Sequence, residues 1–318
     1  MLTHLQSGSD ALDLFYGPFM LTTFFFLSGY VHRQPATFKE HFTKKVKGLF
    51  VPWLIFSNFN IPLSAVISLR TTDTRSELIW NALQIRGSGD GIWFVAALFV
   101  AFIPFYFVIK WNKPVHACVL SFVLSLISVL YKNLMNPEFL PWGSTALPWH
   151  AEYMFQAMLW MVLGYYFRAY AEEGFNRLNT TGNRVILWAV YLITAYIPAE
   201  RWGDYWTIPF SYIRSILGIL AIISICKVIK TNRYIRFVGA NTLTYFALHG
   251  KLYAVIEAVL GKFSMYGVML DNAVTSSIVA VVITVVMSFI LIIPATIINR
   301  WFPWVAGKKY TKTSGAVK

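Results

Sequence analysis

The stretch AVTSSIVAVVITVVMSFILIIPATII, residues 273–298, carries no charged side chain. A helix needs about 20 predominantly apolar residues to cross a membrane, because each adds about 1.5 Å and the hydrocarbon layer is about 30 Å thick. This segment therefore predicts a membrane-spanning helix. Eight further segments follow the same rule: 12–31, 49–69, 92–110, 115–131, 152–169, 185–198, 208–226 and 240–260. The sixth of these, 185–198, is the shortest. The sequence predicts an all-α, polytopic transmembrane helix bundle of about nine helices.

The composition excludes an ordinary soluble protein. Of the 318 residues, 57% are apolar and 13% are charged. A soluble domain of this length cannot bury so much apolar surface, since much of any folded surface faces water. We expect one membrane-embedded domain over residues 1–318, with a membrane region over 12–298 and a cytoplasmic tail over 299–318. Both cysteines, Cys118 and Cys226, lie inside apolar segments and predict packing roles without a disulfide.

The charges predict how the chain lies in the membrane. The net charge is +13, with 27 Lys and Arg against 14 Asp and Glu. These charges occupy short loops between apolar segments, which favours a membrane protein over a nucleic-acid partner. One set of alternate loops, including the C-terminal tail, holds most of them, whereas the other holds Arg70, Arg75, Arg86, Lys132, Arg201 and Lys262. The richer set and the C-terminus are therefore expected in the cytoplasm. The loop WNKP at 111–114 predicts a tight turn.

The same count has a consequence for the N-terminus. Nine helices with a cytoplasmic C-terminus place Met1 outside, and no signal peptide is visible that would carry it there. We therefore expect the chain to lack a first membrane helix whose outer end lies near His4.

A few ionisable groups are expected inside the membrane, where they cost several kcal/mol and normally face a bundle interior or a cavity. Arg214 lies about 9 Å from the outer end of its helix, and His249 about 13 Å from the inner end of its own. Glu152, together with His150, opens the fifth segment from the outside. Each group has a functional and a structural interpretation. Arg214 could equally pair with Glu257 or Glu152 to join helices, and His249 could be a hydrogen-bonded interhelical histidine.

The first inner loop is basic, with Lys44, Lys45 and Lys47 close together. Such a cluster either anchors anionic lipid headgroups or binds a phosphorylated donor. Two histidines of the same loop, His32 and His41, are expected to face solvent or headgroups. The sequence shows no metal-ligand cluster and no glycine-rich phosphate loop, so we expect no metal and no bound cofactor.

Four segments, taken together in order, resemble a known family. They are FFFLSGY at 24–30, KVKGLFVPW at 45–53, IWFVAALF at 92–99 and VGANTLTYFALH at 238–249. Each is similar to a motif of the integral membrane acyltransferase family 3, whose members O-acylate surface polysaccharides and other glycans. The likeness covers most of the chain and is strongest to the glycan O-acetylase branch.

The resemblance implies ten helices and a catalytic histidine at the outer end of the first, about twenty residues before the FFFLSGY motif. His4 has this spacing from Phe24, so the family pattern implies that His4 is the catalytic base. Arg214 would then stabilise the oxyanion or pair with a carboxylate that orients the base, and Glu152 would be that orienter. His249 is a second candidate on motif position alone.

The resemblance also implies acetyl-CoA as a cytoplasmic donor, with Lys44, Lys45 and Lys47 as its binding residues. Two departures from the family pattern matter. The paired arginines of the family are here Lys45 and Gly48, and lysine lacks the bidentate fork of arginine. The histidine that the branch carries just before its phenylalanines is absent from FMLT at 19–22.

These implications converge on transfer of an acyl group, expected to be acetyl, from a cytoplasmic acyl-CoA to a hydroxyl of a cell-surface glycan or lipid-linked sugar. Two alternatives stay open. A transporter or flippase for glycan intermediates would also use charges near the midplane. A non-catalytic partner subunit would suit a shortened relative. The family's spread implies the inner membrane of a bacterium.

Overall fold

The computed structural model describes residues 10–58, 92–136, 145, 147–197, 204–262 and 273–308. Every regular element that they form is a helix, which confirms the all-α prediction. The α-helices are α1 (Asp10–Tyr30), α2 (Phe38–Lys45), α3 (Val51–Asn58), α6 (Trp93–Lys110), α7 (Pro114–Leu134), α8 (Met154–Tyr166), α9 (Glu172–Leu178), α10 (Thr181–Tyr196), α11 (Asp204–Cys226), α12 (Arg233–Ala240), α13 (Thr242–Leu260), α15 (Ala273–Ile290) and α16 (Ile292–Trp301). Short 3-10 or π segments join some of them: η2 (Val46–Phe50), η4 (Pro148–Tyr153), η5 (Phe167–Ala171) and η7 (Pro303–Ala306).

Among these described helices, 5 stretches are long and apolar enough to cross a membrane. They are Trp93–Lys110, Pro114–Leu134, Trp206–Cys226, Thr242–Leu260 and Val274–Trp301, and each corresponds to a predicted segment. The predicted segments 12–31, 152–169 and 185–198 appear as α1, as η4 with α8 and η5, and as α10. Most of segment 49–69 lies outside the described residues. The chain is a multi-pass membrane protein.

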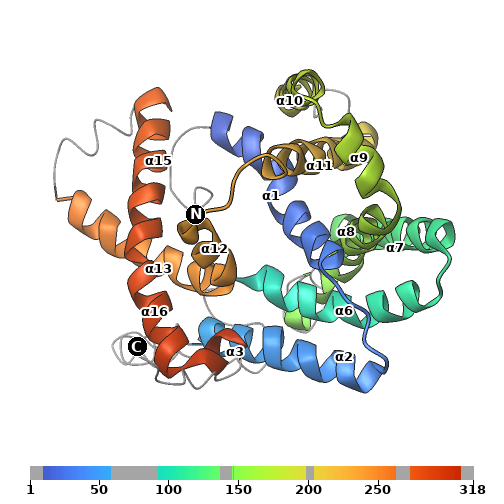
Figure 1. The fold of residues 1–318 in the computed structure, drawn as a ribbon, viewed down its shortest axis with the longest axis horizontal. Coiled ribbons are helices and arrows are strands. Elements are labelled where there is room, and N and C mark those ends of the chain that lie inside the picture. Colours follow the sequence, from blue (N-terminus) through green and yellow to red (C-terminus); the bar gives the residue numbers. More distant parts are fainter. Residues whose placement is uncertain are drawn as a thin grey trace, which may run out of the picture.

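The main hydrophobic core is built largely by α1, α6 and α8. In the view of Figure 1, α7, α9, α10 and α11 lie to the right of the molecule and α12, α13, α15 and α16 to the left. In α6, 72% of the most apolar stretch is buried inside the protein, against 22% in α7. Both helices are strongly apolar. The difference in burial shows that α6 is a core helix, whereas α7 presents many of its apolar side chains to lipid. Figure 1 shows α10 and α15 at the periphery of the bundle.

Two glycines explain how closely α1 and α8 approach each other. A Cβ added at Gly29 would overlap the carbonyl oxygen of Met161, and one added at Gly164 would overlap the carbonyl oxygen of Phe26. Small residues at such crossings let two helix backbones touch. Gly29 belongs to the FFFLSGY motif, so this part of the motif has a packing reason.

The turn between α6 and α7 forms where the sequence predicts it. α6 ends at Lys110, Asn112 adopts a left-handed conformation with φ of 54°, and Pro114 is the first residue of α7. Asparagine tolerates this conformation, and proline at a helix start sacrifices no hydrogen bond.

The C-terminal helices are joined by polar contacts. The Lys308 ammonium donates to the side-chain oxygens of Asn241 (2.6 Å) and Asn299 (2.7 Å). The predicted segment 273–298 consists of two helices, because α15 ends at Ile290 and α16 begins at Ile292, with Pro294 in its first turn. Gly307, with φ of 68°, packs its backbone on that of Gly48. The C-terminal turn thus lies against the segment that follows α2.

Candidate active site

The basic segment after α1 forms a short amphipathic helix. The Thr37 hydroxyl accepts a hydrogen bond from the Glu40 backbone N–H (3.2 Å), which caps the start of α2. Threonine followed three residues later by glutamate is a recognised helix-start pattern. With α2 so placed, Phe38, His41 and Lys45 share the face that packs on α6, as the ring contacts of Phe38 and His41 with Tyr106 show.

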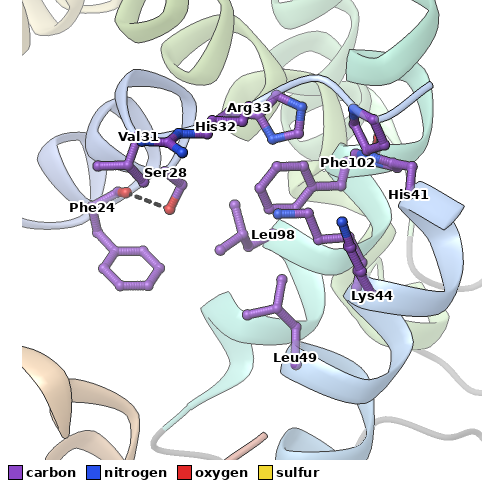
Figure 2. A pocket seen from close by; sticks show the side chains of 13 residues that line it. Phe24, Ser28, Val31, His32, Arg33, His41, Lys44, Leu49, Leu98 and Phe102 are labelled. Atoms are coloured by element: carbon purple, nitrogen blue, oxygen red, sulfur yellow. Dashed lines mark hydrogen bonds between the residues drawn. The ribbon is translucent and has the colours of Figure 1, made fainter. Parts of the chain in front are cut away.

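A pocket of about 360 Å³ lies between α1, α2 and α6, and we refer to it as the Lys45 pocket. Figure 2 shows Phe24 and Ser28 of α1 on one side of it and His41 and Lys44 of α2 on the other. Its lining consists of Phe24, Ser28, Val31, His32, Arg33, Pro35, His41, Lys44, Lys45, Gly48, Leu49, Leu98 and Phe102. Three of these side chains are cationic at neutral pH and none is a carboxylate, so the pocket favours an anionic ligand.

Lys45 is the most constrained cation of this pocket. Its ammonium lies 3.3 Å from the centroid of the Phe102 ring. Burial first, and then the neighbouring charge of Lys44, lowers the pKa of Lys45 to about 8. A lysine held in an apolar setting beside a second cation gains from a bound anion that restores favourable electrostatics. Lys44 also lines the pocket, whereas Lys47 is exposed and does not.

The prediction that His32 and His41 face solvent or headgroups is wrong. Their exposed fractions are 8% and 1%, and their ring centroids lie 5.4 Å apart. The His41 Nε2–H donates to the Phe102 carbonyl oxygen (3.0 Å). Burial first, and then the charge of Lys45, lowers the pKa of His32 to about 3, so this imidazole is neutral at physiological pH. The spacing of Phe38, His41 and Lys45, which is helical, was the available sequence signal for a buried His41.

A second pocket, of about 330 Å³, lies between α1, α6, α7, α8 and α11, and we refer to it as the Trp93 pocket. It is lined by Gly17, Leu21, Thr22, Phe25, Trp93, Val129, Tyr153, Gln156, Trp160, Ile208, Ser211, Tyr212 and Ser215. None of these residues carries a charge, in contrast to the Lys45 pocket. The lining combines aromatic rings with hydroxyl and amide groups, which suits a neutral polar ligand.

Glu152 and His150 form a pair beside the Trp93 pocket. The His150 Nδ1 lies 3.3 Å from Glu152 Oε1, and Glu152 Oε2 accepts the Leu147 N–H (2.8 Å). The His150 ring packs on Trp93, with centroids 5.6 Å apart, and Trp93 lines the pocket. A buried carboxylate that holds one nitrogen of an imidazole is the arrangement that orients a catalytic base.

The backbone at this pair is strained. Trp149 and His150 both have positive φ, of 57° and 55°. Two successive bulky residues in this region cost about 1–3 kcal/mol each, and such strain gathers at functional sites. It therefore supports a functional interpretation of the His150–Glu152 pair.

The two pockets meet at α1. Phe24 lines the Lys45 pocket and Phe25, the next residue, lines the Trp93 pocket. Their ring centroids are 6.2 Å apart, and the Phe24 ring also packs against Phe94 at 4.9 Å. Phe24 and Phe25, the first two phenylalanines of the FFFLSGY motif, thus form a thin aromatic wall between the two pockets.

The other predicted site residues lie apart from this wall or outside the described chain. Arg214 Nε donates to the Thr194 carbonyl oxygen (2.8 Å), and its NH2 group donates to that of Ile197. It thereby satisfies carbonyls at the end of α10, and within the described residues it forms no salt bridge with Glu152 or Glu257. The catalytic role of Arg214 stays a prediction. His4 lies outside the described residues.

His249 is buried in α13, with an exposed fraction of 1%. Its Nδ1 donates to the Phe246 carbonyl oxygen (2.7 Å), and the Phe246 ring packs against Phe24 and Phe94. His249 therefore contacts Phe246, which in turn packs on Phe24 of the aromatic wall. This placement agrees with either interpretation of the residue, so its role too stays a prediction.

The comparisons with known proteins bear on the activity. A family model described as an acyltransferase domain matches residues 2–297. No curated protein and no solved structure gives a significant match.

Proposed function

The chain belongs to the acyltransferase family matched over residues 2–297 and is thus an enzyme that transfers acyl groups; we propose that it moves an acetyl group from acetyl-CoA to a hydroxyl of a cell-surface glycan or lipid-linked sugar. The observation that carries the proposal is the pair of pockets on either side of Phe24 and Phe25. One pocket suits a polyanionic donor and the other a neutral polyol acceptor. A transferase that brings two such substrates together needs both.

The donor would enter the Lys45 pocket. Its phosphates would lie near Arg33, Lys44 and Lys45, where charge-assisted hydrogen bonds are strongest. The thioester arm would then run over Leu98 toward Phe24. At about 360 Å³ the pocket is at the low end of the range for ligand sites, about 300–1,000 Å³, so it would hold the arm with its acyl group while the nucleotide end stays near the mouth.

Transfer then requires a base for the acceptor. His4 would remove the proton of the acceptor hydroxyl, whose oxygen attacks the thioester carbonyl; the C–S bond breaks and the thiolate leaves and takes up a proton. The His150–Glu152 pair, next to the Trp93 pocket, would position the acceptor hydroxyl or relay its proton. The hydrogen bonds of Arg214 to α10 support its structural interpretation, and His249 would support the aromatic wall.

The orientation in the membrane follows the charges. The cations of the Lys45 pocket belong to one of the loops rich in Lys and Arg. The His150–Glu152 pair lies near Trp93, at the N-terminal end of α6. We propose that the donor pocket and the C-terminus are cytoplasmic, that the Trp93 pocket opens toward the outer half, and that the membrane is a bacterial inner membrane.

The test is mass spectrometry of surface glycans from cells with and without the gene. Loss of one acetyl group per modified sugar, restored by the gene, is the expected result. Unchanged glycan mass together with altered glycan location would instead identify a transporter. Recovery of acetylation only when a second acyltransferase is present would identify a partner subunit.

A further inference from the structure

We propose that the Trp93 pocket binds one pyranose ring of the acceptor, stacked between aromatic side chains and hydrogen-bonded by Thr22, Gln156 and Ser211. That the bound sugar is the acceptor of the reaction rests on the proposed function. That the pocket binds a sugar is argued from the residues that line it.

Four of the five aromatic rings that line the pocket form two pairs. Trp93 and Tyr153 lie 4.4 Å apart by ring centroids, and Trp160 and Tyr212 lie 6.0 Å apart with nearly parallel planes. A pyranose has apolar C–H faces between its equatorial hydroxyls, so it packs on aromatic faces while its rim stays polar. The rings offer rigid apolar area for such a face.

The three serine and threonine hydroxyl groups of the pocket already donate to backbone carbonyls. Thr22 Oγ1 donates to the Pro18 carbonyl oxygen (3.1 Å), Ser215 Oγ donates to the same oxygen (2.7 Å), and Ser211 Oγ donates to that of Ile208 (2.6 Å). Each hydroxyl has one proton, so its use here leaves only lone pairs for a ligand. These three oxygens therefore act as acceptors and select a ligand rich in O–H donors.

Gln156 adds the complementary group. It lines the pocket, is half-buried, and makes no hydrogen bond with another described residue. Its amide offers both donors and an acceptor, which match the two roles of a sugar hydroxyl. Among the described residues no charged side chain lines the pocket, so a neutral polyol is a better match for it than an anion or a cation.

The size of the pocket limits the ligand. At about 330 Å³ it is at the low end of the range for ligand sites, about 300–1,000 Å³. One sugar unit with its substituents fits this space better than an extended oligosaccharide, whose further units would lie outside the pocket.

The experiment measures sugar binding directly on the full chain purified in detergent. Saturation-transfer NMR with methyl glycosides of glucose, galactose, mannose and N-acetylglucosamine, without donor, gives a dissociation constant for each. We expect saturable binding of at least one. Gln156→Leu removes the amide at similar volume and should weaken that binding about tenfold, since two hydrogen bonds are lost.

A matched pair of variants controls for local structure. Thr22→Val and Thr296→Val each exchange a hydroxyl that donates to the carbonyl four residues earlier, but Thr296 is on the exposed face of α16. Thr22→Val should weaken binding several-fold and Thr296→Val should leave it unchanged. Tyr153→Phe, which keeps its ring, provides a second pocket variant if Gln156→Leu fails to fold.

The outcomes separate this inference from the proposed function. If the protein transfers no acetyl group but binds sugar, and the pocket variants bind that sugar more weakly, the sugar site is supported and the proposed reaction is refuted. If the protein transfers acetyl groups and the acceptor KM is the same in Gln156→Leu, in Thr22→Val and in the unaltered protein, the sugar site is refuted and the proposed reaction stands. No saturable binding of any glycoside also overturns the site.

Discussion

The Lys45 pocket and the Trp93 pocket share one helix, α1, yet their chemistry is opposite. The first is lined by Arg33, Lys44 and Lys45, whereas the described residues that line the second offer rings, hydroxyls and an amide and carry no charge. They are separated by Phe24 and Phe25, whose side chains point into different pockets from consecutive positions. One apolar helix can therefore separate a pocket for an anionic ligand from a pocket for a neutral ligand, because neighbouring side chains on a helix point about 100° apart.

A substitution that separates α1 from α8 should disturb both pockets at once and should be the most damaging change, because α1 lines both. Gly29→Ala places a Cβ inside the carbonyl oxygen of Met161, so α1 and α8 must separate. Overpacking against backbone should cost about 3 kcal/mol of folding stability, since no flexible side chain can move aside. Fluorescence size-exclusion after heating measures the loss. Gly174→Ala, where an added Cβ meets nothing within 4 Å, is the control and should retain or gain stability. Equal melting of the two variants would contradict the close contact.

The next effect concerns the chemistry beside the Trp93 pocket. His150→Asn keeps a residue that tolerates positive φ but removes the imidazole, and Glu152→Gln removes the charge that holds it. Each should lower kcat about 100-fold with an unchanged donor KM. The double variant should be no worse than either single one, since the two residues act as a unit. Exposed His116→Asn is the control, and additive losses in the double variant would contradict a shared role.

The third effect should be confined to the Lys45 pocket. Lys45→Met removes a half-buried cation at similar length, and should raise the donor KM about tenfold through loss of a charge-assisted contact. Sugar binding in the Trp93 pocket should not change. Lys47→Met, which alters an exposed neighbour outside the lining, is the matched control. Equal KM values for Lys45→Met and Lys47→Met would point to a diffuse surface charge as the determinant.

The smallest effect is a difference in pH dependence. Because the pKa of Lys45 is lowered to about 8, the free pocket has this cation below pH 8 and loses it above. Affinity for the anionic donor should therefore fall by a few-fold as the pH rises from about 7 to 9, while binding of a neutral sugar in the Trp93 pocket, which Lys45 does not line, should stay constant. Titration of each ligand across this range provides the measurement. Lys45→Arg should abolish the donor's pH dependence; its persistence would assign the titration to another group.

Much of the fold could be predicted because each membrane helix is a continuous run of apolar residues in the sequence. The turn at Asn112 and Pro114 was predictable for a similar reason, since both residues have strong local preferences. The break at Leu291 was not predicted, although Pro294 in the first turn of α16 is a local signal for it, because the apolar run continues on both sides and by itself predicts one helix. The four motifs likewise predicted the family, which the match over residues 2–297 confirms.

The site was harder to predict, and the histidines show why. His32 and His41 occur in a basic loop, where solvent exposure is the ordinary expectation, but α2 turns His41 onto Phe102 and buries it. Lys45 and Lys47 are two residues apart and equal in charge, yet only Lys45 lines the pocket. Composition could not separate them, because the direction of each side chain depends on where α2 packs.

The amino-acid sequence alone was enough to predict an all-α membrane protein of the acyltransferase family, since hydrophobic length and local motifs are properties of contiguous residues. The packing of the helices is what places Phe24 and Phe25 in different pockets, brings α1 and α8 into contact at Gly29 and Gly164, and gathers uncharged described residues around the Trp93 pocket. These properties depend on side chains from helices far apart in the chain, whose contacts form only when the helices pack.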